Sequence, residues 1–292
     1  MKKGRNLRSV NTDGGVNLQF KLLSAIGIII IVSGHCYHGG MELAYNWFPP
    51  YSYNLALFVF ISGYFYKTDY EENVGKYIWK RTKRLLIPAY LWNIFYGGMV
   101  AFLGLFGFTI GAKPDLYNLF VMPFVDGEAF QYNLGSWFVY PLFLVCIINV
   151  LFRKFLKLIH LDNEFIVLIV YLAIGMIGIN TALENPTAIN GIVKLLVRTM
   201  FFLPCYEFGR FYKAVLEKKD TLNNVAYFAI IFAVQLILLT FCKDLEYTPS
   251  SFTKFNNGFI IPYISSITAI AFWLRVSRLL VPAIGNSKLV RL

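Results

Sequence analysis

Charged residues are scarce in this chain, and their scarcity excludes an ordinary water-soluble domain. Lys, Arg, Asp and Glu make up 15% of the 292 residues, whereas 57% are hydrophobic and 18% are aromatic. A soluble domain carries about 25% charged residues. So few charges cannot cover a water-facing surface, and the composition therefore predicts that lipid solvates much of the protein.

Patterns of metal ligands are missing as well. The chain has three histidines and four cysteines. The cysteines lie inside or at the edges of apolar runs, where a free thiol behaves as a small buried hydrophobic group. We therefore expect no bound metal ion and no bound cofactor. The four positions are Cys36, Cys146, Cys205 and Cys242.

Long apolar segments dominate what remains. A helix needs about 20 apolar residues to cross a bilayer. In lipid every backbone N–H and C=O group must pair within the protein, and these segments do not show the alternation of polar and apolar residues that a β-barrel would, so they should be helices. The sequence therefore predicts an all-α polytopic transmembrane helix bundle with about eight spans. Residues 1–21 would form a basic cytoplasmic segment and residues 22–292 the transmembrane domain. The expected spans lie near 22–38, 51–66, 85–108, 136–152, 165–180, 194–212, 224–242 and 258–276.

The basic residues are distributed unevenly between the connections. The net charge is +11, and 22 of the 27 Lys and Arg residues fall in the N-terminal segment and in every second connection after it. Such a bias sets the orientation of a membrane protein, with the basic side in the cytoplasm. Both termini are therefore expected in the cytoplasm, and this placement argues against a nucleic-acid partner.

His35 is the most informative polar residue in the expected first span. Eleven helical steps from Ser24 return to nearly the same face, so Ser24 and His35 share one stripe of the helix. Gly27 and Gly34 lie close to that stripe, and small residues let a neighbouring helix or a ligand approach the backbone. A histidine within a span faces a cavity, where it can accept a hydroxyl proton, or it lies among the outer lipid headgroups. Position alone leaves both readings open.

Four segments together resemble the membrane acyltransferase-3 family, in the order in which that family carries them. LLSAIGIIIIVSGH (Leu22–His35) is similar to its first helix, and LFVFISGY (Leu57–Tyr64) to its aromatic second span. KRTKRLLIP (Lys80–Pro88) resembles its Arg-x-x-Arg run, and Trp137-Phe138-Val139 resembles the opening of a later helix. Weaker similarity continues as far as Gly285.

The resemblance implies transfer of an acyl group, commonly acetyl from acetyl-CoA, to a hydroxyl of a saccharide or glycoconjugate. It places the catalytic histidine at His35 and the donor-binding pair at Arg81 and Arg84. Ser24 stands where the family has a basic residue, and Lys21, one turn earlier, is expected to supply that charge. Members commonly continue beyond a turn that Gly285-Asn286-Ser287 resembles, so a shortened member is expected.

The basic run allows two readings of its own. Arg81 and Arg84 are three residues apart and would be neighbours on one helical face. With Lys83 they suit the phosphates of coenzyme A, which guanidinium groups grip in pairs. A basic cluster beside a span also anchors that span to anionic lipid.

Other polar groups lie within or beside the later spans. Arg198 and Glu207 should face opposite sides of one helix, with Arg210 as the partner of Glu207. Arg198 and Glu207 would be structural, or they would line the acceptor cavity. Asn133 and Trp137 would flank an outer acceptor pocket or belong to an interfacial aromatic belt.

The sequence thus predicts a membrane-bound O-acyltransferase with acyl-CoA as co-substrate, a saccharide or glycoconjugate acceptor and membrane lipid around it. The expected location is a bacterial inner membrane. The alternatives are a transporter or flippase for a lipid-linked saccharide, or a catalytically inactive family member. A transporter more often shows inverted repeats with broken helices, and the sequence shows none.

Overall fold

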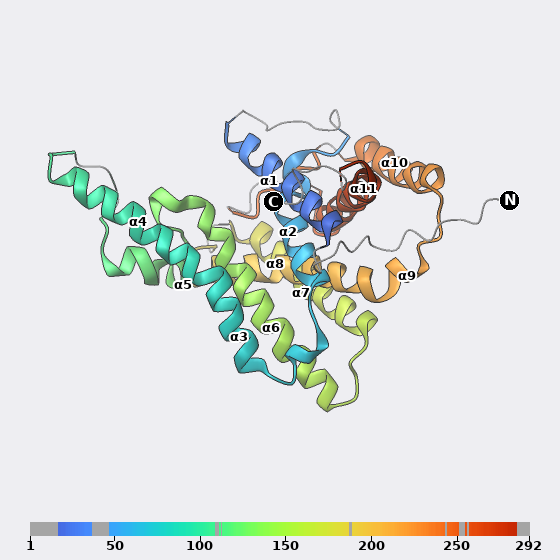
Figure 1. Ribbon diagram of the computed structural model, residues 1–292, viewed down its shortest axis with the longest axis horizontal. Coiled ribbons are helices and arrows are strands. Elements are labelled where there is room, and N and C mark those ends of the chain that lie inside the picture. Colours follow the sequence, from blue (N-terminus) through green and yellow to red (C-terminus); the bar gives the residue numbers. More distant parts are fainter. Residues whose placement is uncertain are drawn as a thin grey trace.

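The computed structural model describes residues 17–36, 47–108, 111, 113–186, 189–242, 244–250, 255 and 257–284. Within these residues the chain forms helices and no β-strand (Figure 1), which confirms the all-α prediction for the described part. The first half contains α1 (Leu18–Cys36), η1 (Pro50–Ser52), α2 (Asn54–Tyr64), η2 (Thr68–Tyr70), α3 (Val74–Arg81), η3 (Thr82–Leu86), α4 (Ile87–Gly104), η4 (Tyr117–Val121), α5 (Met122–Val125) and η5 (Gln131–Phe138). The second half contains α6 (Val139–Leu158), α7 (Glu164–Glu184), α8 (Gly191–Phe211), η7 (Tyr212–Leu216), α9 (Glu217–Lys219), α10 (Asn224–Phe241) and α11 (Ile261–Ile284).

Asparagine side chains mark the starts of several of these helices. Asn163 accepts a hydrogen bond from the backbone N–H of Phe165 (2.8 Å) at the start of α7. Asn223 accepts one from Ala226 N–H (2.8 Å) at the start of α10. Each bond satisfies a backbone donor that the first helical turn leaves unpaired. The apolar runs that follow then extend each helix across the expected membrane thickness.

Six helical stretches are long and apolar enough to cross a bilayer, by length and composition. They run over Leu18–Cys36, Val74–Gly104, Gln131–Leu158, Glu164–Glu184, Asn224–Phe241 and Ile261–Ala283, with only the described residues considered. The first begins at Leu18, four residues before the expected boundary at 22. Residues 1–16 of the expected cytoplasmic segment lie outside the described residues. The total of eight crossings and the cytoplasmic placement of both termini stay predictions.

Two expected spans take a different form from the other six. The segment expected near 51–66 forms α2, whose 11 residues make a helix of about 16 Å, too short to cross a hydrocarbon core of about 30 Å alone. The segment near 194–212 forms α8, which has 21 residues and is long enough, but carries four charged side chains. Most of α8 is buried, and it packs against α2, α6 and α7. Protein rather than lipid therefore surrounds this charged helix.

Helices α2 and α8 meet at two glycines. A Cβ atom on Gly63 of α2 would lie 1.8 Å from the carbonyl oxygen of Tyr206 in α8. A Cβ on Gly209 of α8 would lie 1.9 Å from the carbonyl oxygen of Phe60 in α2. Both positions lack room for any side chain. Glycine at each position is what lets the two backbones touch in the centre of the molecule.

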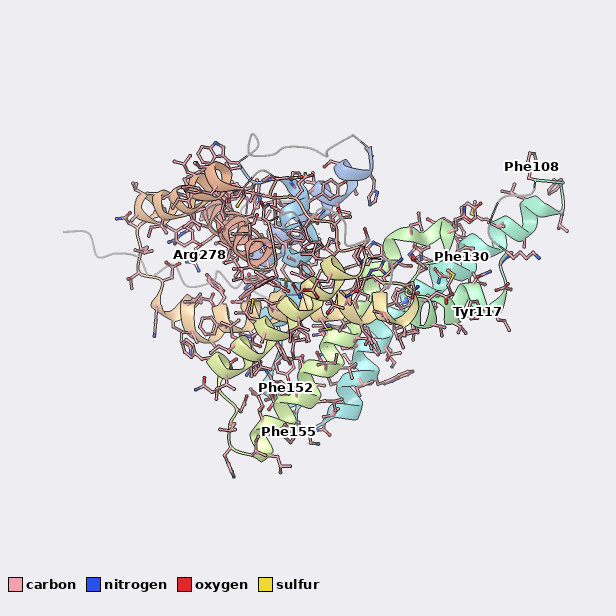
Figure 2. All side chains as sticks on the ribbon, turned by 180° about the vertical axis from the view of Figure 1, so that it is seen from behind. Phe108, Tyr117, Phe130, Phe152, Phe155 and Arg278 are labelled. Atoms are coloured by element: carbon pink, nitrogen blue, oxygen red, sulfur yellow. The ribbon has the colours of Figure 1, made fainter. Side chains whose placement is uncertain are left out.

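The other helices lie around this pair. Helix α1 packs against α2 and α11, and α10 packs against α11. The outer part of α4, with η4 and α5, forms an arm that projects away from the remaining helices (Figures 1 and 2). Figure 2 shows Phe108 at the tip of this arm and Phe155 at the bottom of the molecule, away from the arm. Apolar side chains of the arm, such as Trp92 and Phe102, are exposed as expected for contact with lipid.

Helix ends that the charge count assigns to one side of the membrane do lie together. The end of α6, the start of α7 and the end of α8 are joined by ion pairs of Arg153 and Arg210. The end of α2 reaches the start of α9 through a hydrogen bond from the Tyr64 hydroxyl to Glu217 (3.0 Å). Arg278 near the end of α11 donates to the Tyr212 hydroxyl (3.2 Å). The basic connections therefore share one end of the bundle, called the basic end below.

Candidate functional site

His35 lies in the last turn of α1 and is exposed. Ile28, which shares its stripe, is also exposed, whereas Leu23, Gly27 and Ile30 form the buried face of the helix. The Tyr51 hydroxyl donates to the carbonyl oxygen of Gly34 (2.9 Å) and fixes the backbone beside the histidine. The imidazole is therefore held at the end of α1 that lies away from the basic end, and it is open to a partner from outside the packed core.

Lys21 and Ser24 lie near the other end of the same helix. The Ser24 hydroxyl donates to the carbonyl oxygen of Phe20 (2.8 Å), a bond within its own helix. Lys21 is exposed. The helical rise places its Cα roughly 21 Å from that of His35. A lysine side chain cannot bridge that distance, so direct contact between the two groups is excluded.

Arg81 and Arg84 lie on an uninterrupted helix, but not on one face. Residues 82–86 form a π-helical turn between α3 and α4. The π-helix closes i→i+5 hydrogen bonds, and this wider turn changes the angle between side chains three residues apart. Arg81 is half-buried, and its Nε donates to the Tyr77 hydroxyl (3.0 Å). Arg84 and Lys83 are exposed, and the Lys83 ammonium lies 5.0 Å from the centre of the Trp79 ring. The expected pair is therefore divided between an inward and an outward side chain.

Six basic residues lie between positions 67 and 84, before and within the α3–α4 helix. No ion pair with a carboxylate is formed by any of the six within the described parts of the chain. Arg153, Arg210, Arg275 and Arg278, elsewhere at the basic end, all have one. An unpaired cluster of cations attracts anions strongly. The six residues are Lys67, Lys76, Lys80, Arg81, Lys83 and Arg84.

Glu207 is held by a partner that the sequence did not indicate. Arg153 of α6, which is fully buried, places its Nη2 2.8 Å from the Glu207 carboxylate and 2.6 Å from that of Glu164. Its Nη1 lies 3.1 Å from Asp162. Arg210, the expected partner of Glu207, instead pairs with Glu164 (2.9 Å). The predicted pair of Glu207 with Arg210 was wrong, because each of the two side chains pairs with a partner on a neighbouring helix instead. The network joins the ends of three helices.

Arg198 lies nearer the other end of α8, where backbone carbonyls surround it. Its guanidinium donates to the carbonyl oxygens of Gly127 and Ser250. The guanidinium carbon lies 4.6 Å from the centre of the Trp137 ring. Arg198 and Glu207 therefore have separate partners toward the two ends of α8. Of the residues expected around an acceptor, Trp137 and Arg198 are the two in contact.

Asn133 belongs to a separate polar cluster. Its side-chain amide donates to the Asn93 side-chain oxygen (2.7 Å), and Asn93, fully buried in α4, donates to the carbonyl oxygen of Leu119 (2.8 Å). The backbone of Asn133 leaves helical geometry within η5. The hydroxyls of Ser136 and Tyr140 are buried close by in sequence and make no hydrogen bond in the described structure. This cluster ties the projecting arm to the start of α6.

The structure thus leaves the expected site residues in separate places, with Asn133 and Glu207 in the clusters just described. His35 lies at one end of α1, Arg81 with its neighbours lies at the basic end, and Trp137 with Arg198 lies beside the loop that contains Gly127. No hydrogen bond or ion pair between described residues joins one group to another. Sequence reasoning missed Tyr77, Arg153 and Asn93. The lone Asn93 within an apolar run was a signal for the last, since a buried amide needs a partner.

Comparison with known families adds to this geometry. A family model described as an acyltransferase domain, that of the acyltransferase-3 family, matches residues 17–292. No curated protein and no solved structure matches the chain. The family match covers His35, the basic run around Arg81, and Trp137 in a single alignment.

Proposed function

The chain belongs to the acyltransferase-3 family, and on that premise we propose that it transfers an acyl group from acyl-CoA to a hydroxyl of a saccharide or glycoconjugate. Family membership and the six apolar helices make it a membrane acyltransferase. The nature of the donor, of the acceptor and of the acyl group is our proposal, as is location in a bacterial inner membrane. Acetyl is the acyl group we expect.

The observation that carries the donor assignment is the unpaired cation cluster at the basic end. Arg81 is half-buried, has no carboxylate partner in the described structure, and points toward Tyr77. Tyr77 in turn lies 3.4 Å, hydroxyl to hydroxyl, from the buried Tyr206 of α8. Coenzyme A is polyanionic, and guanidinium groups bind its phosphates with charge-assisted hydrogen bonds. Arg84 and Lys83 would reach the same phosphates from the exposed side.

His35 supplies the chemical step in this proposal. By one route its imidazole accepts the proton of the acceptor hydroxyl while that oxygen attacks the thioester carbonyl, and coenzyme A leaves as the thiolate. By the other route the imidazole attacks the thioester carbonyl and coenzyme A leaves as the thiolate; the hydroxyl oxygen then takes the acyl group, and its proton passes to the imidazole that is released. Both routes require the pantetheine arm to cross the bundle, because the cations and the histidine lie at opposite ends. Lys21 lies near the start of α1, with Ser24 one turn further along the helix. Its charge would attract the donor to the end of the path that lies far from His35.

The acceptor would approach from the His35 side of the membrane. Trp137 and Arg198 form a polar–aromatic pair there, and Asn133 offers amide hydrogen bonds that suit sugar hydroxyls. Glu207 lies in the ion network at the basic end, so we assign it a structural role. The acceptor assignment depends on the family match more than on geometry.

The test is transfer of radiolabelled acetyl from acetyl-CoA to a saccharide by the purified protein in lipid nanodiscs. We expect His35→Ala to lose about a hundredfold or more of the transfer rate, since removal of a general base costs that much. The control is His160→Asn, because His160 is exposed in a connection and has φ 58°, which asparagine tolerates. Full transfer by folded His35→Ala would overturn the assigned role. Saccharide movement across vesicles without release of coenzyme A would favour the transporter alternative.

A further inference from the structure

Four tyrosine rings meet where the chain enters the α3–α4 helix. Tyr70 of η2 stacks on Tyr77 of α3, with ring centres 4.6 Å apart and planes 28° apart. Tyr66 contacts both rings edge to face, at 5.6 Å and 6.0 Å. Tyr206 of α8 contacts Tyr66 at 6.3 Å. The rings form a continuous aromatic cluster from the surface at Tyr70 to the buried centre at Tyr206.

Cations lie over three of these rings. The Lys80 ammonium is 5.0 Å from the centre of Tyr70 and donates to its hydroxyl (3.2 Å). The Arg81 guanidinium is 5.1 Å from the centre of Tyr77. Arg210 lies 4.9 Å from Tyr66, but its charge is taken up by Glu164. The two cations nearest the surface are therefore the ones left without a carboxylate.

Burial differs sharply along the cluster. Tyr66, Tyr77 and Tyr206 are 2%, 2% and 0% exposed, whereas Tyr70 is partly exposed and Lys80 is exposed. A ligand arriving from the basic end would therefore meet Tyr70 and Lys80 first. A partly exposed aromatic side chain beside unpaired cations fits a molecule with a flat ring and phosphate groups.

We propose that Tyr70 and Lys80 form the subsite for the adenine nucleotide end of the acyl-CoA donor. The proposal rests on the proposed function and goes further, because it names where the base and its phosphates bind. The adenine ring packs against Tyr70, Lys80 contacts the phosphates at the surface, and Arg81 contacts those next to the pantetheine arm. The arm then follows Tyr77 and Tyr206 inward. An anionic lipid headgroup would use the cations but has no flat ring for Tyr70.

The first test compares full-length and truncated donors in the transfer assay. Tyr70→Ala should raise the KM for acetyl-CoA about tenfold, since stacking of a base on an aromatic side chain contributes free energy of that order. The KM for acetyl-pantetheine and both kcat values should stay unchanged, and Tyr70→Phe should restore the KM. Lys80→Gln should raise the KM for acetyl-CoA alone. Equal effects on both donors would overturn the subsite.

Matched controls come from the same chain. Tyr96 is half-buried on α4 and stacks on Trp92 (5.6 Å), so Tyr96→Ala removes a similar ring elsewhere. Lys154 is exposed at the end of α6, so Lys154→Gln removes a similar charge. Neither change should alter the KM for acetyl-CoA. A change as large as that of Tyr70→Ala would show a general effect of surface substitution and would contradict the proposal.

The second test needs no catalysis and separates this proposal from the proposed function. Binding of adenosine 3′,5′-bisphosphate to the purified protein should weaken about tenfold in Tyr70→Ala and in Lys80→Gln. Undiminished binding in both variants overturns the subsite, even where acetyl transfer succeeds. Nucleotide binding that depends on Tyr70 without any acetyl transfer supports the subsite and counts against the proposed function. If anionic lipid vesicles displace the bound nucleotide but excess unlabelled nucleotide does not, the site is a lipid site and the proposal is overturned.

Discussion

Arg153 is the residue on which the charged network at the basic end depends. It is fully buried and contacts three carboxylates, those of Asp162, Glu164 and Glu207. Glu207 has no other cation within ion-pair distance in the described structure. A buried charge that loses its partner costs far more than the pair contributes when intact. The network therefore makes the α6–α8 contact sensitive to single substitutions.

Arg153→Leu should lower the free energy of unfolding by about 3 kcal/mol or more, because it leaves the Glu207 carboxylate unpaired. Arg153→Leu/Glu207→Leu should recover most of that loss, since apolar replacement of a whole buried pair is close to neutral. Thermal unfolding in detergent, followed by tryptophan fluorescence, measures both. Exposed Lys154→Gln is the control. If Arg153→Leu is as stable as Lys154→Gln, the proposed role of Arg153 in stability is contradicted.

Glu71 makes stability depend on pH. Burial raises the pKa of the Glu71 carboxyl above its ordinary value, and the neighbouring Asp162 carboxylate raises this pKa further. An acid whose pKa is raised by folding stabilises the protein fully below its unfolded pKa. This contribution is lost as the pH rises through the folded pKa. We therefore expect Glu71→Gln to reduce the fall in Tm between pH 4 and pH 8, whereas exposed Glu72→Gln does not. An identical fall in wild type and Glu71→Gln would refute this.

At the scale of elements, the contact between α2 and α8 organises the bundle. It depends on Gly63 and Gly209, each of which faces a backbone carbonyl of the other helix. The sequence indicated an aromatic second span ending in Ser-Gly-Tyr, but nothing local shows which helix its glycine meets. That partner is set by packing between residues more than a hundred positions apart. Helix periodicity therefore predicted the helices but not their central contact.

Gly209→Val should prevent folding, because its side chain would overlap the Phe60 carbonyl and force the helices apart. Gly63→Val should do the same. Gly98→Ala is the control, since a Cβ at Gly98 meets nothing within 4 Å. Fluorescence-detected size-exclusion chromatography should show a single peak for wild type and Gly98→Ala and aggregates for the two valine variants. A normal peak for Gly209→Val would show that the contact is not required.

The π-helical turn at residues 82–86 makes the two expected donor-binding arginines unequal. Arg81→Gln should raise the KM for acetyl-CoA about tenfold, since a hydrogen bond to a charged group contributes about 1.5–3 kcal/mol. Arg84→Gln should change it less than about threefold, because an exposed ion pair contributes little. Steady-state kinetics with each variant separates them. Equal losses would mean that both arginines face the donor.

Sequence alone could place Arg81 and Arg84 three residues apart, but not predict this turn. A π-helical turn depends on how the surrounding helices pack, and residues 82–86 carry no glycine or proline to mark it. The pairing of Arg153 with Glu207 was hidden for the same reason. His35 and Trp137, by contrast, could be singled out from the sequence because they belong to local patterns within the range of the family match, and their roles stay predictions.

At the scale of the whole molecule, polar groups lie toward both ends of the bundle. Unpaired cations and the tyrosine cluster lie at the basic end, and His35 lies at the other end of α1. The distribution of basic residues predicted which helix ends lie together, and the ion pairs at the basic end agree with it. In the proposed function the donor binds at the basic end and the acceptor at the other, which would define the direction of acyl transfer.

The most direct test of this account uses membrane vesicles of known orientation. Acetyl-CoA does not cross the bilayer, so it reaches only the outward-facing side of a sealed vesicle. We expect inside-out vesicles, which expose the cytoplasmic face, to release free coenzyme A thiol in a manner that depends on His35, and sealed right-side-out vesicles to release none. Release only from right-side-out vesicles, or equal release by His35→Ala, would contradict the account.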